Sequence, residues 1–181
     1  NGCHVRIIEL FVNDEYRGIY SLMEPVDRKQ LKIKKYKKGV KRCLWKAVEW
    51  EGTTFYDPVD SYDNHSATLM GFEAKYPEPG DDADTTDYAP LAAVMNFVAN
   101  ASDENFRDQI NTYIDLPVMM DYSLFIDMIN GIDNGGKNCY WSIYDKNKSG
   151  RMSITPWDMD ATFGQNYANN VEPSELTKPD N

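Results

Sequence analysis

The sequence predicts an α+β fold in a single domain spanning residues 1–181. Apolar and polar residues alternate in several short segments of residues 1–80, a pattern typical of strands. Apolar residues recur at helical spacing between residues 88 and 131. The 181 residues, of which 41% are hydrophobic, are enough to bury one core. We therefore expect a β-rich part, 1–80, followed by a helical part, 81–181.

Composition excludes several classes of protein. The formal net charge is −10 at pH 7, so a nucleic-acid partner, which requires a basic face, is not expected. A basic run at 28–46 and an acidic run at 81–87 are most simply a solvated turn and loop, although the basic run can also form an edge that faces an anion. No segment has the roughly 20 apolar residues that a transmembrane helix needs.

The three cysteines are too few and too widely separated for a disulfide framework, so free thiols are expected. Residue 1 falls inside an expected strand. We therefore expect the chain to be a fragment that lacks upstream sequence, and the presence of further downstream sequence is left open.

A hairpin is expected at the start of the chain. Residues 4–12 alternate between two faces, which favours a strand covered on one face and partly covered on the other. Asn13, Asp14 and Gly18 supply turn chemistry before apolar spacing resumes at 19–23. Two interpretations follow: a lid whose backbone amides approach phosphates, or a plain surface hairpin. One glycine is weak support for a lid, so the plain hairpin is favoured.

Two later strands each carry a lysine among apolar residues. Residues 43–50 place Lys46 on the side of the strand that also carries apolar residues, and residues 71–76 place Lys75 between two aromatic residues. A lysine that points inward requires an anionic partner, whereas one at a strand edge extends its charge into solvent. The residues alone leave both interpretations open.

Helices are expected in the second half of the chain. Residues 88–101 have apolar side chains on one face, and this spacing continues through residues 106–114. Asp115 occupies an N-cap position with Pro117 just inside the next helix, which Gly131 ends. This last helix is the most hydrophobic, so we expect it to be the core helix.

Residues 133–164 carry the chemistry. Asp133 and Asn138 have the Asp-x-x-x-x-Asn spacing of a protein-kinase catalytic loop, in which the Asp receives a hydroxyl proton and the Asn holds Mg²⁺. A hairpin expected after Asn138 should bring Asp158 and Asp160 beside it. Carboxylate and amide oxygens are the ligands that Mg²⁺ prefers. The sequence thus predicts a metal and phosphate site here.

Two simpler interpretations compete with this one. Asp133 and Asn134 can cap a turn that Asn138 closes, while Asp158 caps a helix that begins at Met159, and the residues alone leave that alternative open. Asp145, Asn147, Ser149 and Gly150 imitate the first half of a calcium loop, but its twelfth position is Pro156 instead of a glutamate. We therefore expect a plain hairpin turn at 145–150.

Five segments together resemble the CotH family, the atypical kinases named after spore coat protein H. In chain order they are ELFVNDEYRGIYSLMEPVD, LWKA, FEAKYPE, DNGGKN and ITPWDMDATFG, and PWDxDxxFG is the most distinctive. The resemblance implies a diverged protein-kinase-like fold with an N-terminal β-rich part and a C-terminal helical part that carries a catalytic hairpin. It also implies ATP and Mg²⁺ or Mn²⁺ as cofactors, and transfer of phosphoryl to Ser or Thr hydroxyls of a partner protein.

The same resemblance implies roles for residues of the catalytic segment. Asp133 is similar to the catalytic base, and Asn138 and Asp158 are similar to the metal ligands. Asp160 is a further metal ligand or supports one. Lys137 either neutralises charge that develops on the phosphate or faces solvent.

The resemblance also implies a phosphate-binding lysine. Lys46 resembles the lysine that pairs with the phosphates of ATP, and Lys75 is the second choice. Glu24 is the candidate for the carboxylate that pairs with this lysine.

Two other functions remain hypotheses. A non-catalytic coat or cell-surface interaction module would keep the fold without turnover. A carbohydrate-associated module would rest only on the 13% aromatic content, and aromatic residues are more often in cores. The family context implies a secreted, cell-surface or spore-coat location.

Overall fold

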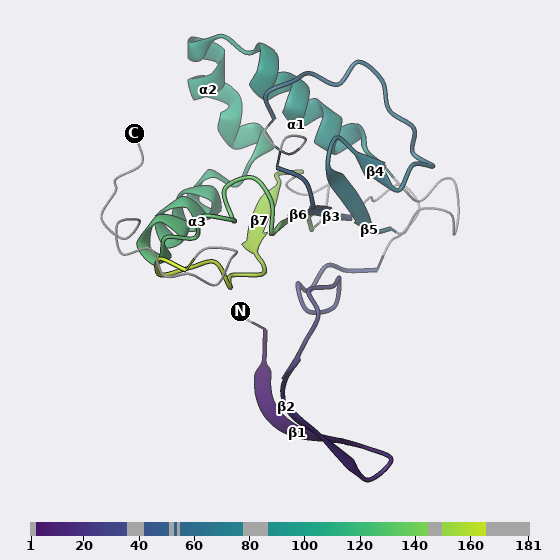
Figure 1. Ribbon diagram of the computed structural model, residues 1–181. Helices are drawn as coiled ribbons and strands as arrows, with labels where there is room; N and C mark the ends of the chain where they lie inside the picture. The colour runs from purple at the N-terminus through teal and green to yellow at the C-terminus, as the bar shows by residue number, and fades with distance from the viewer. Residues whose placement is uncertain are drawn as a thin grey trace.

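The computed structural model describes residues 3–35, 42–50, 53, 55–77, 87–144 and 150–165. These residues form antiparallel sheets and three helices, which confirms the predicted α+β class. Figure 1 shows a body made of a sheet with helices, and an N-terminal hairpin that projects from it. Within the described residues, no helix is both long and apolar enough to cross a membrane.

One five-stranded sheet organises the body. Its spatial order is β4-β5-β3-β6-β7, and each pair of neighbours is antiparallel. The strands are β3 (Cys43–Ala47), β4 (Thr68–Leu69), β5 (Phe72–Tyr76), β6 (Cys139–Ile143) and β7 (Ser153–Pro156). Since β3 pairs with β6, strands from both predicted parts of the chain share this sheet. The division at residue 80 stays a prediction.

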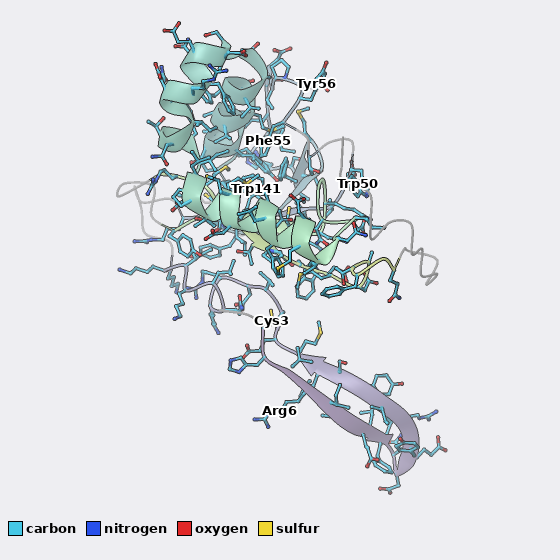
Figure 2. All side chains as sticks on the ribbon, turned by 90° about the vertical axis from the view of Figure 1, so that its left-hand side faces the viewer. Cys3, Arg6, Trp50, Phe55, Tyr56 and Trp141 are labelled. Carbon is cyan, nitrogen blue, oxygen red and sulfur yellow. The ribbon has the colours of Figure 1, made fainter. Side chains whose placement is uncertain are left out.

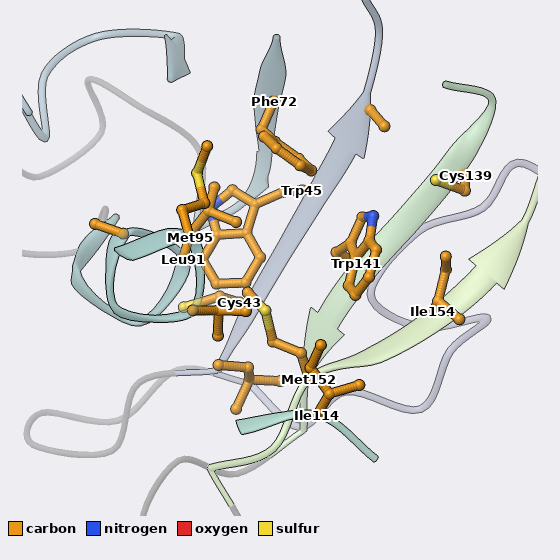
Figure 3. Close-up of a cluster of buried hydrophobic side chains, with 14 of the residues drawn as sticks. Cys43, Trp45, Phe72, Leu91, Met95, Ile114, Cys139, Trp141, Met152 and Ile154 are labelled. Atoms are coloured by element: carbon orange, nitrogen blue, oxygen red, sulfur yellow. The ribbon is translucent and has the colours of Figure 1, made fainter. Parts of the chain in front are cut away.

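Both faces of the sheet are buried at its centre. Trp45 of β3 and Trp141 of β6 are cross-strand partners in the larger core, where Trp45 lies near Leu91 and Met95 (Figure 3). Leu44 belongs to a smaller cluster with segment 26–33 on the other side. The expectation that the face of Leu44 and Lys46 is the apolar one was therefore incomplete, because the larger core lies on the opposite face.

The first two helices are separate elements. α1 (Ala89–Asn100) packs Leu91, Ala92, Val94 and Met95 into the core, as its spacing predicts. α2 (Asp103–Tyr113) begins after Ser102, whose hydroxyl accepts a hydrogen bond from the backbone N–H of Asn105 at 3.3 Å. Such an N-cap satisfies one of the free amides of the first turn. The extended backbone of Ala101 separates the two helices.

α3 (Leu116–Ile129) is only partly a core helix. Its buried side chains are Tyr122, Ile126 and Ile129, and the exposed Met120, Leu124 and Met128 lie on another face. The prediction of a core helix was therefore wrong for this second face, because α3 has apolar residues on more than one face and the body covers one side. Asp115 occupies the N-cap position, but its side chain makes no capping hydrogen bond. Instead its carboxylate lies 3.8 Å from Arg151.

The N-terminal hairpin consists of β1 (Val5–Val12) and β2 (Glu15–Met23). Its turn residues Asn13 and Asp14 have left-handed φ angles of 51° and 64°, as a tight two-residue hairpin turn requires. Most of its large apolar side chains are exposed, including Ile7 at 69% and Ile19 at 67%. The expected cover on one face is not provided by any described element, and Figures 1 and 2 show the hairpin extending away from the body.

Parts of three predicted segments lie outside the described residues. They are 36–41 of the basic run, 81–86 of the acidic run and 145–149 of the hairpin turn.

Candidate functional site

The site is built on the loop 133–138, which connects α3 to β6. α3 ends at Ile129, the next residue, Asn130, turns the chain through its left-handed conformation, and Gly131 donates its N–H to the carbonyl of Ile126 at 2.9 Å. At the other end of the loop, the backbone N–H of Asn138 donates to Ala47 at 3.2 Å. These bonds attach the loop to α3 and to the end of β3.

The β6–β7 hairpin brings its two outer ends together, as expected. Cys139 pairs with Pro156, and the N–H of Trp157 donates to the carbonyl of Asn138 at 2.9 Å. Asp158, the next residue, has a left-handed φ of 54°. The chain after β7 therefore starts directly beside the end of the loop 133–138.

The side chain of Asn134 connects the two outer ends of the β6–β7 hairpin. Asn134 is fully buried, and its Nδ2 donates to the carbonyls of Asn138 at 3.0 Å and Trp157 at 2.7 Å. Its own carbonyl accepts from the Tyr122 hydroxyl at 2.6 Å. Burial raises the pKa of Tyr122 far above its usual value, so this hydroxyl stays protonated as a donor. Asn134 is thus a clamp between the two ends of the hairpin.

Asp133 presents a buried carboxylate whose two oxygens are both held. Asp133 is only 6% exposed. Oδ2 accepts from Asn138 Nδ2 at 2.7 Å and lies 3.4 Å from the ammonium of Lys137. Oδ1 accepts from Trp50 Nε1 at 3.0 Å. A carboxylate that is oriented in this way can accept a proton from a hydroxyl that approaches it.

The predicted metal ligands supply oxygen donors at one end of the hairpin. Because Asn138 uses its Nδ2 on Asp133, its Oδ1 is the atom that can bind a cation. Asp158 and Asp160 are exposed. Among the residues that the structure describes, no three His, Cys, Asp or Glu side chains form a metal-binding group. A donor set of one amide and two carboxylates still fits Mg²⁺, which usually keeps several waters and shares phosphate oxygens.

Asp158 and Asp160 also line a cavity of about 930 Å³. Its apolar wall includes Val26 and Leu31 from the segment after β2, and Phe125 of α3. The cavity therefore places two carboxylates beside apolar side chains that come from distant parts of the chain.

The predicted lysines lie on the sheet face that also carries Tyr140. Lys46 is the cross-strand partner of both Glu73 and Tyr140. Lys75 forms an ion pair with Glu73 at 2.7 Å. Burial first, then the negative charge of Glu73 and more weakly that of Asp158, raise the pKa of Tyr140. Glu73 is thus the carboxylate beside the two lysines. The negative charge of Asp158 acts on Tyr140, which lies on the same face of the sheet.

Glu24 lies elsewhere. Its carboxylate accepts from the backbone N–H of His4 at 3.2 Å, at the base of the β1–β2 hairpin. It lines a second cavity, of about 780 Å³, together with Asp27 and Lys29. Among the described residues, Glu24 makes no ion pair with Lys46 or Lys75, and its predicted role as their partner stays a prediction.

A family model described as CotH kinase protein matches residues 1–180. The chain belongs to the CotH kinase family. This match confirms the resemblance drawn from the five sequence segments. A search of curated proteins finds no match.

Within this CotH-family chain the structure brings together Asp133, Lys137 and Asn138, and the backbone of Trp157, the residue before Asp158, is hydrogen-bonded to Asn138. The catalytic and ligand roles of these residues stay predictions.

Sequence reasoning missed three residues of the site: Trp50, Glu73 and Asn134. Trp50 and Glu73 reach the site through strand register and tertiary contacts. Glu73 stands in the segment FEAKYPE, in which only Lys75 was predicted to have a role, and Trp50 stands in none of the five segments. Asn134 did stand in the motif, immediately after Asp133. Its hydrogen bonds to two backbone carbonyls, which only the structure reveals, distinguish its role from that of its neighbour.

Proposed function

We propose that this CotH-family protein is an ATP- and divalent-metal-dependent kinase that transfers the γ-phosphoryl group to a Ser or Thr hydroxyl of a partner protein. The observation that carries the proposal is the Asp133–Asn138 pair. Asp133 offers a fixed carboxylate, and Asn138 donates its Nδ2 to that carboxylate, while its amide oxygen has no donor among the described residues. Family membership supports the same reaction class.

Each residue has a distinct role in this proposal. Asp133 accepts the proton of the acceptor hydroxyl as it attacks phosphorus. Asn138 Oδ1, Asp158 and Asp160 hold Mg²⁺ or Mn²⁺, which when bound offsets negative charge on the phosphates. Lys137 lies next to Asp133 and contributes positive charge to the same place. Positioning and electrostatics then supply most of the rate enhancement.

The lysines of the sheet face bind the phosphates in this proposal. Glu73 holds Lys75 by an ion pair and faces Lys46 across the strands. We therefore assign Glu73, ahead of Glu24, as the carboxylate that orients the phosphate-binding lysine. A carboxylate in this position holds the lysine ammonium in one direction.

Metal-dependent nucleotide binding provides the test. We expect ATP with Mg²⁺ or Mn²⁺ to raise the melting temperature, because a ligand at 100 times its Kd stabilises the folded state by about 2.7 kcal/mol. Asp158→Ala should abolish the shift. Asp121→Ala, at an exposed position on α3, is the matched control and should keep it. If the wild type shows no metal-dependent shift at millimolar ATP, the kinase proposal fails.

One observation favours a second function, that of a non-catalytic coat or cell-surface interaction module. The β1–β2 hairpin exposes apolar side chains on both faces, as surfaces that bind other proteins often do. Under this alternative, partner binding would be unchanged by Asp133→Ala, and no phosphoryl would be transferred. A secreted, cell-surface or spore-coat location remains a proposal that suits either function.

A further inference from the structure

Trp50 touches the loop 133–138 in two ways. Its indole N–H donates to Asp133 Oδ1 at 3.0 Å. Its ring lies so close to Gly136 that a Cβ atom there would sit 2.6 Å from Cε3 and 3.0 Å from Cζ3. Real Cβ atoms do not approach other atoms so closely, because dispersion attraction turns into repulsion at that distance. The ring therefore occupies the space of a side chain at position 136.

The two oxygens of Asp133 depend on different parts of the chain. Oδ2 is held by Lys137 and Asn138, which belong to the same loop. Among the described residues, Oδ1 is held by Trp50 alone, which follows β3. The rotation of the carboxylate plane is therefore set from outside the loop that carries Asp133.

A second residue that follows β3 also contacts the loop 133–138. The Thr53 hydroxyl donates a hydrogen bond to the carbonyl of Gly136, and Thr53 is buried. Trp50 itself is 41% exposed, at the surface of the body and away from the β1–β2 hairpin (Figure 2). The structure thus gives Trp50 a specific polar contact with the site, in contrast to Trp45 and Trp141, which fill the core.

We infer that Trp50 is a positioning residue that orients the Asp133 carboxylate toward the acceptor hydroxyl, and that Gly136 is required because a side chain there would displace the indole. The inference rests on the proposed function, in which Asp133 accepts the hydroxyl proton. A neutral phenyl ring at position 50 would keep the contact with Gly136 but leave Oδ1 without its donor.

The contact itself is tested by the indole N–H signals of the four tryptophans in the nitrogen-15 NMR spectrum. Trp50→Phe identifies the Trp50 signal, and unchanged signals of the other three show that the fold is kept. We expect Asp133→Asn and Gly136→Ala each to shift the Trp50 signal. Gly135→Ala is the matched control, since a Cβ there lies 3.9 Å from the ring, an ordinary contact. If Asp133→Asn left the chemical shift of the Trp50 indole N–H unchanged, the inference would be overturned.

The positioning role is tested by transfer kinetics of the full chain. We expect Trp50→Phe to lower kcat about ten-fold or more, as loss of a hydrogen bond to a charged group does, with KM for ATP changed less than about two-fold. In the Asp133→Asn background, Trp50→Phe should cause no further loss. A kcat equal to that of the wild type, or an effect confined to KM, overturns the inference and leaves the proposed function standing. Absence of transfer by the wild type instead overturns the proposed function, and the catalytic role of Trp50 with it.

Discussion

At the scale of single residues, Asp133 and Asn134 are neighbours with different tasks. Asp133 turns its carboxylate toward Asn138, Lys137 and Trp50, whereas Asn134 is fully buried and bridges two backbone carbonyls. Both are short polar residues that favour turns. The spacing to Asn138 was enough to select Asp133 from the sequence, but the clamp role of Asn134 depends on burial, which adjacent letters do not reveal.

Removal of the Asn134 side chain should destabilise the whole site. Asn134→Ala removes the donor of the Trp157 carbonyl, whereas the Asn138 carbonyl keeps the N–H of Trp157, and a buried polar group left unsatisfied costs roughly 1–3 kcal/mol. We expect the free energy of unfolding, measured in urea, to fall by about 1–3 kcal/mol. Asn105→Ala, an exposed position in α2, is the control and should change it by less than about 0.5 kcal/mol. Equal effects of the two substitutions would contradict the clamp role.

At the scale of elements, the β1–β2 hairpin separates what the sequence can predict from what it cannot. Its two strands follow from local alternation, and the structure contains both. The turn is tighter than expected, because it consists of Asn13 and Asp14, while Gly18, which was also expected in the turn, lies inside β2. The exposure of the hairpin does not follow from alternation, because the cover of a strand is supplied by elements elsewhere in the chain. The same holds for α3, since a helix with apolar residues on more than one face does not show which side will be packed.

This hairpin should be the least protected regular element of the protein. A two-stranded ribbon is marginally stable in water by itself, and no other described element makes extensive contact with it. In hydrogen–deuterium exchange followed by mass spectrometry, we expect peptides from 5–23 to exchange much faster than those from 43–47 and 139–143. Comparable protection of the two regions would contradict the exposed arrangement, and would mean that another surface covers the hairpin in solution.

At the scale of the whole molecule, the central strand β3 connects the predicted parts of the site. It pairs with β5, which carries Glu73 and Lys75, and with β6, which follows the loop 133–138. The α+β class was predictable because it needs only local patterns. The sheet order was not, because antiparallel pairing between β3 and β6 joins segments far apart in sequence, and no local signal encodes that register. Asn138 and Asp158 could be paired from the sequence because a hairpin is a local element. Trp50 and Glu73 could not be placed, because their contacts depend on the non-local pairing of strands.

Phosphoryl transfer is the most direct test of the central claim, that Asp133 is the catalytic base of an active kinase. The measurement is transfer of a labelled γ-phosphate from ATP, with Mg²⁺ or Mn²⁺, to casein as a general Ser- and Thr-containing acceptor. We predict transfer by the wild type and a loss of about 100-fold or more in Asp133→Asn, because a positioned general base contributes roughly 10²–10⁴-fold. Transfer at the same rate in Asp133→Asn, or no transfer by the wild type with either metal, would contradict the claim.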